Sequence, residues 1–248
     1  MFEKLKQFFS FHTVICLFLI AACTAITYNA LAFRPPIRAA ESYLRALAGG
    51  DTEAALEFST GNAAWSASRL KEISIKADVD RVGPSVAALG RGWARVSALV
   101  ELTLQDGSAD VGWYSIDVVK TEQGWKVASI REHEPDVSGT GTFVKKTDTT
   151  SAEQVFRSYI DELATGNLQG SLKYLVGPTR KRQEISAAVL GKGAVIGEVE
   201  ELKAEPVWKR GKSMLVRFDY KADGRDVSVT ATYYKTKQGW KITKIVQN

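Results

Sequence analysis

The sequence predicts an α+β protein in which an apolar transmembrane helix precedes two repeated cones, each made of N-terminal helices packed on a curved antiparallel sheet. Three observations lead to this fold class. Residues 7–33 contain no Asp, Glu, Lys or Arg, and two short sequence blocks recur at nearly the same offset. Within each half, the apolar spacing also changes from a helical period to a period of two. At 248 residues, with 45% apolar and 25% charged, the chain is long enough for this arrangement.

The charge-free run of 27 residues exceeds the roughly 20 that a helix needs to cross the hydrocarbon core of a membrane. Lys4 and Lys6 flank one end and Arg34 and Arg38 the other, so the flanking charge gives little orientation signal. A short N-terminal tail before a long chain suits an uncleaved signal anchor, with a cytoplasmic N-terminus and extracytoplasmic domains. We therefore expect residues 7–33 to contact membrane lipid as a single-pass span.

A cleaved signal peptide and a lipoprotein signal are alternatives for this segment. Residues 20–23 read IAAC, which resembles a bacterial lipobox, and residues 30–32 have Ala-x-Ala spacing. The residues after Cys23 stay apolar, whereas a lipid-anchored chain usually turns polar soon after its cysteine, so we favour the uncleaved span. Pro35 and Pro36 are expected to end the helix.

An internal repeat divides the remaining chain in two. The block AAESYLRALAGGD at residues 39–51 is matched by VFRSYIDELATGN at residues 155–167, 116 positions later. The block KTEQGWK at residues 120–126 recurs as KTKQGWK at residues 235–241, 115 positions later. Two blocks with nearly equal offsets indicate a duplicated domain.

The repeat sets the expected domain boundaries. Residues 1–36 are expected to form the cytoplasmic tail and the transmembrane helix, residues 37–132 the first domain and residues 150–248 the second. The residues between the domains, 133–149, read HEPDVSGTGTFVKKTDT. This polar stretch with Gly, Ser and Thr is typical of a linker.

Each half is predicted to begin with helices. In the first half, apolar residues at helical spacing define a stripe at Ile37, Ala40, Leu44 and Leu47. The glycines at residues 49–50 end this helix, and Asp51 is expected to cap the next one. In the second half, Thr150 and Glu153 have the spacing of a capping box, and Asn167 is expected to cap the following helix. A third short helix is expected in each half.

Strands are predicted after the helices. Apolar and polar residues alternate over residues 96–104, and Asp106-Gly107 supplies a turn into further strands over residues 111–120 and 125–131. The second half repeats this pattern, with alternation over residues 214–220 and 227–233 around a turn at Asp223-Gly224. Helices followed by an antiparallel meander define the α+β class.

This order of elements, with Gly-Asp or Gly-Asn after the first helix and a closing Gly-Trp-Lys strand, resembles the nuclear transport factor 2-like superfamily. The matching positions are Tyr43, Gly50, Asp51 and Trp125 in the first half, and Tyr159, Gly166, Asn167 and Trp240 in the second. A membrane span before two such domains looks like scaffold proteins of Gram-positive conjugation channels, and also like the non-catalytic N-terminal domain of some penicillin-binding proteins. No site motif of the conjugation proteins occurs here, so the resemblance implies no site residues.

Composition argues against most enzyme mechanisms. The only cysteines, Cys16 and Cys23, lie in the apolar run, and the only histidines are His12 and His133, the latter in the expected linker. We therefore expect no disulfide, no metal site, no cofactor and no histidine acid–base chemistry in either domain.

The catalytic alternative that the resemblance brings is a ketosteroid isomerase-like enzyme, which needs a carboxylate inside the apolar mouth of the cone. Strand alternation places Asp117 on an outer face, opposite Tyr114, and Asp219 on the face of Arg217 and Lys221. Both carboxylates are therefore expected on solvated faces, and we predict that the protein is not an enzyme.

Two other features are candidate binding sites. Trp125 and Trp240 could line a ligand pocket in the cone interior, but each opens a last strand, where a large aromatic is expected to pack in the core. Net charge is −3 over residues 34–142 and +7 over residues 143–248. A candidate anionic-partner patch is formed by Arg180, Lys181, Arg182, Lys209, Arg210 and Lys212.

Basic residues of this kind also form ordinary solvated surface. Nucleic acid is not an expected partner, because no aromatic residues interleave with the basic ones. The sequence thus favours a non-catalytic, membrane-anchored extracytoplasmic scaffold or accessory subunit of a membrane complex such as a conjugation or secretion channel. Its expected partners are other subunits of that complex, further copies of the chain, or an anionic surface or polymer. A small apolar-ligand-binding module is the alternative.

Overall fold

The computed structural model describes residues 2–70, 77–136, 141–190, 196–197 and 199–248. The first elements along the chain are α1 (Phe2–Ala32), α2 (Arg34–Gly49), α3 (Thr52–Glu57), α4 (Gly61–Leu70), β1 (Ala77–Gly90), β2 (Trp93–Leu104), β3 (Ala109–Thr121) and β4 (Gly124–His133). They are followed by α5 (Lys146–Ala164), α6 (Leu168–Ser171), the 3₁₀ turn η1 (Leu172–Tyr174), α7 (Gly177–Leu190), β5 (Val199–Arg210), β6 (Ser213–Ala222), β7 (Arg225–Thr236) and β8 (Gly239–Gln247).

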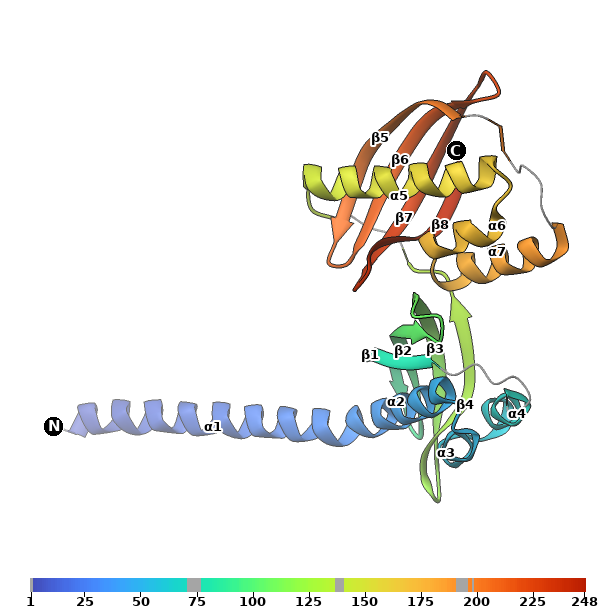
Figure 1. Cartoon of the computed structure of the whole chain (residues 1–248). Coiled ribbons are helices and arrows are strands. Elements are labelled where there is room, and N and C mark those ends of the chain that lie inside the picture. Colours follow the sequence, from blue (N-terminus) through green and yellow to red (C-terminus); the bar gives the residue numbers. More distant parts are fainter. Residues whose placement is uncertain (1, 71–76, 137–140, 191–195, 198) are drawn as a thin grey trace.

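The two halves of the chain have the same architecture, which confirms the α+β class. Each contains a four-stranded antiparallel meander, in the order β1-β2-β3-β4 and β5-β6-β7-β8. Helices precede each sheet in sequence (Figure 1). Helices α2 and α4 pack on the first sheet and α5 and α7 on the second, while α3 and α6 pack against neighbouring helices. We call residues 34–134 the first unit and residues 146–248 the second unit.

Helix α1 extends away from the two units (Figure 1). It ends at Ala32, and α2 starts at Arg34 with Pro35 and Pro36 in its first turn. Proline lacks the N–H that an interior helical position needs, but its fixed φ suits a first turn, so this pair separates the two helices as predicted.

Among the described residues, no helix combines the length and the hydropathy expected of a membrane span.

The helix-end and capping predictions are confirmed at three positions. Gly50 adopts a left-handed conformation at the end of α2, the Asp51 side chain accepts a hydrogen bond from the Ala54 N–H, and Asn167 accepts one from the Gly170 N–H. The capping box expected at Thr150 is wrong, because α5 begins at Lys146 and the Thr150 hydroxyl donates to the Lys146 carbonyl.

The regular structure extends into both ends of the expected linker. His133 is the last residue of β4 rather than a linker residue, and α5 starts four residues before Thr150. Part of the intervening chain adds to the open edge of the second sheet, where Thr142 and Lys209 exchange two backbone hydrogen bonds of 2.8 and 3.1 Å.

The first strand of each sheet, β1 and β5, was not predicted from the alternation of apolar residues. Both are edge strands with register shifts, and both contain a proline, Pro84 and Pro206. Edge strands bury less of each face and tolerate proline, so their apolar pattern is weaker than that of a central strand. Central strand β2 shows the expected alternation, with Val96, Ala98 and Val100 buried.

Each sheet packs its concave face against its own helices to form a separate core. In the first unit the core contains Tyr43 of α2, which is fully buried and donates a hydrogen bond to the Ala63 carbonyl of α4. In the second unit Phe156 of α5 stacks on Phe218 of β6, with ring centroids 4.1 Å apart, and Tyr233 is fully buried beside them. These side chains form the buried interior of each unit.

Candidate functional site

A cluster of charged side chains lies where the two units meet. Figure 1 shows the second unit beside the end of β4, with α7 and β8 nearest the first unit. The first unit contributes its acidic groups Asp80, Glu101, Asp106, Asp110, Glu132 and Glu134. We call the surfaces joined through these six groups the inter-unit contact.

The start of α7 carries three of the basic residues that the sequence singled out. Lys181 places its ammonium nitrogen 2.7 Å from a carboxylate oxygen of Glu132. Arg182 lies 2.8 Å from Glu134, which also accepts from Lys244 at 2.6 Å. Hydrogen bonds from Lys244 and Arg182 hold the pKa of Glu134 below its ordinary value.

Arg180 is buried at the inter-unit contact, with 7% of its surface exposed. Its guanidinium donates to Glu184 of the same helix at 2.9 Å and to the Ser108 hydroxyl of the first unit at 2.8 Å. The Asp106 carboxylate lies 3.6 Å away. A buried guanidinium needs most of its N–H groups paired, and this one reaches across the contact to find its partners.

Two further lysines reach across from turns of the second sheet. Lys212, between β5 and β6, pairs with Glu101 at 2.8 Å, and the Tyr234 hydroxyl donates to the same carboxylate at 2.9 Å. Lys237, between β7 and β8, pairs with Asp80 at 2.9 Å. The hydrogen bond from Lys237 is the main cause of a lowered pKa at Asp80.

Between these ion pairs lies a small apolar centre. The rings of Trp113 and Tyr234 meet edge to face with centroids 5.6 Å apart, and Val111 and Val176 are buried beside them. Next to this centre the Gly177 N–H donates to Asp110 at 2.7 Å. Burial raises the pKa of Asp110, since desolvation disfavours its charged form.

The remaining two residues of the predicted basic patch do not join this contact. Lys209 pairs within the second unit with Asp148, at 2.5 Å, and Arg210 is exposed at the end of β5. Four of the six predicted residues therefore contact carboxylates of the first unit, and a fifth, Lys209, contacts a carboxylate of its own unit. Binding of an external anionic partner stays a prediction. The contrast of −3 against +7 was the sequence signal for the inter-unit contact.

The two predicted tryptophans occupy equivalent places in the two units. Trp240 is buried, and its indole N–H donates to Asp148 at 3.2 Å. The ammonium groups of Lys209 and Lys235 each lie 5.4 Å from the ring centroid of Trp240. Trp125 is half-buried and packs against the first core. Both therefore have a packing role.

Each tryptophan also borders a surface hollow. The hollow at Trp125 has a volume of about 690 Å³ and lies between the start of α2 and the β3–β4 turn. The hollow at Trp240 has a volume of about 620 Å³ and lies between α5 and the β7–β8 turn. The two hollows occupy equivalent positions in the repeat. At the offset of 116 positions, Ser42 and Phe58 of the first hollow correspond to Ser158 and Tyr174 of the second.

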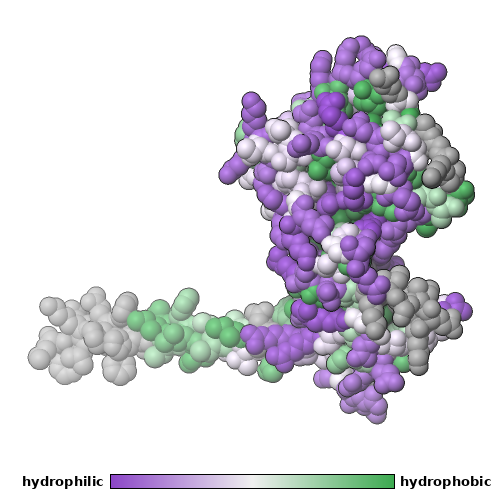
Figure 2. Space-filling model, viewed as in Figure 1, coloured by the Kyte–Doolittle hydropathy of each residue, from purple (hydrophilic) through white to green (hydrophobic). Residues whose placement is uncertain are grey.

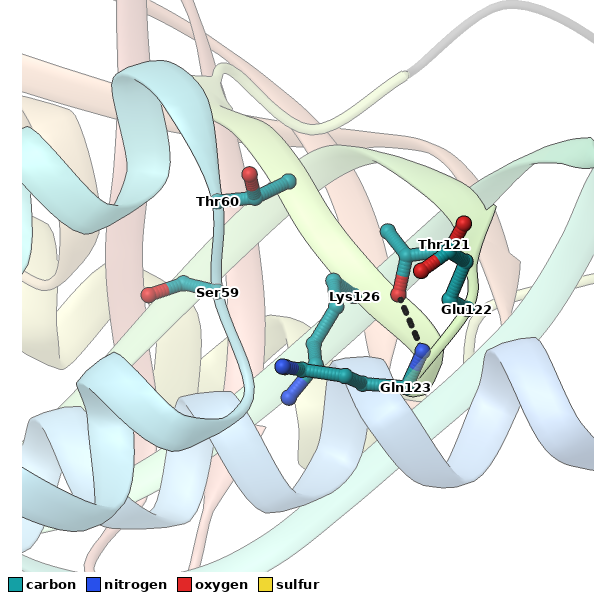
Figure 3. A pocket seen from close by; sticks show the side chains of 6 residues that line it. All are labelled: Ser59, Thr60, Thr121, Glu122, Gln123 and Lys126. Carbon is teal, nitrogen blue, oxygen red and sulfur yellow. Dashed lines mark hydrogen bonds between the residues drawn. The ribbon is translucent and has the colours of Figure 1, made fainter.

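A smaller hollow of about 290 Å³ lies on another side of the β3–β4 turn (Figure 3). It is lined by Ser59, Thr60, Thr121, Glu122, Gln123 and Lys126. The Thr121 hydroxyl accepts from the Gln123 N–H at 3.2 Å, and the Lys126 ammonium donates to the Glu57 carbonyl. The lysine is thus used in holding the turn to the end of α3.

The carboxylates considered for catalysis are engaged in ion pairs. Asp117 accepts from Arg95 at 2.8 Å and from Ser129 at 2.9 Å, and the Arg95 hydrogen bond is the main cause of its lowered pKa. Asp219 lies 3.7 Å from Arg217 on the same strand face. In the part of the chain that the structure describes, no cluster of His, Cys, Asp and Glu could hold a metal ion.

No family model matches the sequence, and no curated protein matches it. Among solved structures, the chain is similar to one described as an Ntf2-like protein involved in plasmid conjugation. The two are 10% identical with a TM-score of 0.33, over 79% of this chain and 86% of that one. It is also similar to a cystatin-like protein from Ruminococcus gnavus ATCC 29149, 13% identical with a TM-score of 0.26, over 90% of this chain and 86% of that one.

Proposed function

We propose that the protein is a non-catalytic, membrane-anchored scaffold or accessory subunit of a membrane complex, such as a conjugation or secretion channel. The observation that carries this proposal is the inter-unit contact. Ion pairs on its rim and an apolar centre at Trp113 and Tyr234 join the two units into one body. A two-unit body at the end of a long helix suits a part that positions other subunits.

The described part of α1 supports an anchor. Its apolar side chains are exposed on a helix that extends away from both units, for example Phe18 at 75% and Ile26 at 69% (Figure 2). Exposed apolar surface of this extent is costly in water and is expected to be covered by lipid or protein. We place the N-terminal side of α1 in the cytoplasm and both units outside, because long domains cross a membrane largely regardless of their charge.

The charged groups support a non-catalytic role. Among the described residues, every buried side-chain nitrogen and oxygen has a hydrogen-bond partner. The carboxylates with lowered pKa values are held by lysine, arginine or hydroxyl partners, and Asp110, whose pKa is raised, receives the Gly177 N–H at the inter-unit contact. Such groups stabilise the fold and are not poised for proton transfer.

Membrane fractionation of the full chain, followed by purification in a mild detergent, tests the proposal. We expect the chain to resist carbonate extraction and to co-purify with other membrane proteins. Protease added to intact spheroplasts should digest both units. Recovery in the soluble fraction, or an intact chain purified alone with activity on a small molecule, would overturn the proposal.

The alternative of lipidation is tested at the two cysteines of α1, which are both exposed. If α1 is an uncleaved anchor, Cys23→Ser leaves the membrane-bound fraction and the intact mass of the N-terminus unchanged, as does the control Cys16→Ser. Loss of membrane binding in Cys23→Ser alone would instead indicate a lipoprotein.

A further inference from the structure

We propose that the hollow beside Trp125 binds the phosphate-bearing headgroup of an anionic phospholipid. This proposal rests on the membrane anchor of the proposed function and names a ligand for the first unit. The hollow lies where α1 meets α2, so it lies next to any membrane that α1 enters. Its walls come from the end of α1, the first half of α2, Phe58 and the β3–β4 turn.

The basic groups of the hollow follow one face of α2. Arg34, Arg38 and Ser42 are spaced by four residues, which places them one above another on a helix, and all three line the hollow. Both arginines are exposed, and within the described residues neither forms an ion pair with a carboxylate. Two guanidinium groups and a hydroxyl on one wall match the oxygens of a phosphodiester.

Part of the lining of the hollow is apolar. Leu31, with 73% of its surface exposed, and Trp125 line it, and Tyr28 lies close by with its ring edge to face on Phe33 at 6.3 Å. Aromatic rings of this kind gather at membrane interfaces. In Figure 2 the apolar surface of α1 gives way to hydrophilic surface where α2 begins. An apolar wall beside two arginines fits the start of an acyl chain below its phosphate.

The helix rise sets these groups at a suitable depth. At 1.5 Å per residue, Arg34 lies about 4 Å beyond Leu31 along the helix and Arg38 about 10 Å beyond it. The headgroup layer on each side of a bilayer is roughly 5–8 Å thick. With Leu31 at the edge of the hydrocarbon, Arg34 therefore lies within the headgroup layer, and the long side chain of Arg38 can reach back into it.

The second unit supplies an internal comparison. Its equivalent hollow, at Trp240, has Gln154 in the place of Arg38. There Asp148 accepts from Lys209 and lies 3.7 Å from Lys235, and the Lys241 ammonium donates to the Lys173 carbonyl, so these three cations already have partners within the unit. Of these two hollows, the one next to α1 combines an apolar wall with arginines that have no carboxylate partner among the described residues. The two units share one architecture but differ in this way at equivalent hollows. This difference points to a ligand at the hollow of the first unit.

The test uses the full chain in detergent micelles that contain equal amounts of phosphatidylglycerol and phosphatidylcholine, with bound lipid counted by native mass spectrometry. We expect the chain to retain phosphatidylglycerol in preference. Each arginine near a membrane surface contributes about fivefold to such binding. Arg34→Gln with Arg38→Gln should therefore reduce the preference by about 25-fold. The matched control, Arg45→Gln with Arg91→Gln, removes two first-unit arginines outside the hollow and should leave the lipid preference unchanged.

Equal retention of the two lipids by the unaltered chain, or an equal loss in both double variants, would overturn the site. Displacement of the lipid by 10 mM inorganic phosphate would show that free phosphate is the ligand and would also overturn it. Carbonate extraction of the same three chains reports separately on the anchor. A chain that resists extraction but shows no lipid preference contradicts only the headgroup site. A chain that is extracted contradicts the anchor, and with it the proposed function.

Discussion

The ammonium nitrogen of Lys212 lies 2.8 Å from a carboxylate oxygen of Glu101, although the two residues are 111 positions apart and belong to different units. The Glu101 side chain is 12% exposed and also accepts from the Tyr234 hydroxyl at 2.9 Å. A carboxylate that is mostly removed from water and bound by two donors from the other unit links the rim of the inter-unit contact to its apolar centre.

Glu101→Gln is expected to destabilise the inter-unit contact. The amide keeps one acceptor oxygen but removes the charge that compensates Lys212, so we expect a loss of about 1–2 kcal/mol in the free energy of unfolding. Thermal unfolding followed by near-ultraviolet circular dichroism, to which the Trp113–Tyr234 pair contributes, measures this loss. Glu122→Gln makes the same change in the exposed β3–β4 turn and should change the free energy of unfolding by less than about 0.5 kcal/mol.

A charge exchange tests the pair of Glu132 and Lys181. Glu132→Lys alone and Lys181→Glu alone each place like charges together, and the combined variant restores an ion pair of opposite direction. Because both side chains are partly exposed, we expect a coupling energy of about 0.2–1 kcal/mol by double-mutant cycle. In 1 M salt, where the screening length is about 3 Å, most of this coupling should disappear. A double variant as unstable as the two single losses combined would contradict the pairing.

Acid is expected to weaken the inter-unit contact through Glu134. Its pKa in the folded state lies below the ordinary value of 4.5. Its contribution to stability is therefore complete above pH 4.5 and is lost as the pH falls through the folded-state pKa. Glu134→Gln should therefore cost about 0.5–1 kcal/mol at pH 7, and this cost should shrink as the pH falls through the lowered pKa. Urea unfolding at pH 7, 5 and 3 measures this. A constant difference across that range would show that Glu134 acts by packing alone.

Asp110 is expected to have the opposite pH dependence. Burial raises its folded-state pKa above the ordinary 3.8, so its neutral form is favoured in the fold and its effect on stability becomes less favourable as the pH rises through the raised pKa. Asp110→Asn keeps an acceptor for the Gly177 N–H without the charge. We expect this variant to gain stability relative to the unaltered chain between pH 4 and pH 7, measured by the same urea series. A variant that loses stability over this range would show that the neighbouring Arg180 and Lys181 require the charge.

Local signals explain which parts of the fold were predictable. Asp51 and Asn167 cap helices through hydrogen bonds three residues away, and the alternation over β2 reflects one buried and one exposed face. The start of α5 was misplaced because Asp148, which the sequence placed in the linker, is held by Lys209 and Trp240. Those partners come from strands far along the chain, so no local pattern reports them.

The candidate sites were also predictable only where a local sequence signal existed. The basic residues of α7 were singled out by their density, but their partners Glu132 and Glu134 carry no local motif. The opposite net charges of the two halves were the available signal, and it indicates attraction without giving a register. The hollow at Trp125 could not be predicted from the sequence either, because its walls come from α1, α2, the end of α3 and the β3–β4 turn.

Gly177→Ala is expected to separate the two units. Gly177 opens α7 with φ at 67°, and a methyl group built there would lie 2.8 Å from the Val111 carbonyl oxygen and 3.1 Å from the Trp113 ring across the inter-unit contact. The oxygen belongs to a paired strand and cannot move freely, so α7 must shift and weaken the Gly177 hydrogen bond to Asp110. We expect a loss of about 2–4 kcal/mol, from backbone strain together with the clash.

Gly224→Ala is the matched control. Gly224 has a similar φ of 73° in the β6–β7 turn, but nothing lies within 4 Å of an added methyl group, so only the backbone strain of about 1 kcal/mol applies. Trypsin cleavage between the units and small-angle scattering report separation, and thermal unfolding reports stability. The alanine at residue 177 should speed cleavage and enlarge the radius of gyration, whereas the alanine at residue 224 should do neither. Equal effects of the two substitutions would mean that strain at a left-handed residue, and not closeness of the units, limits both positions.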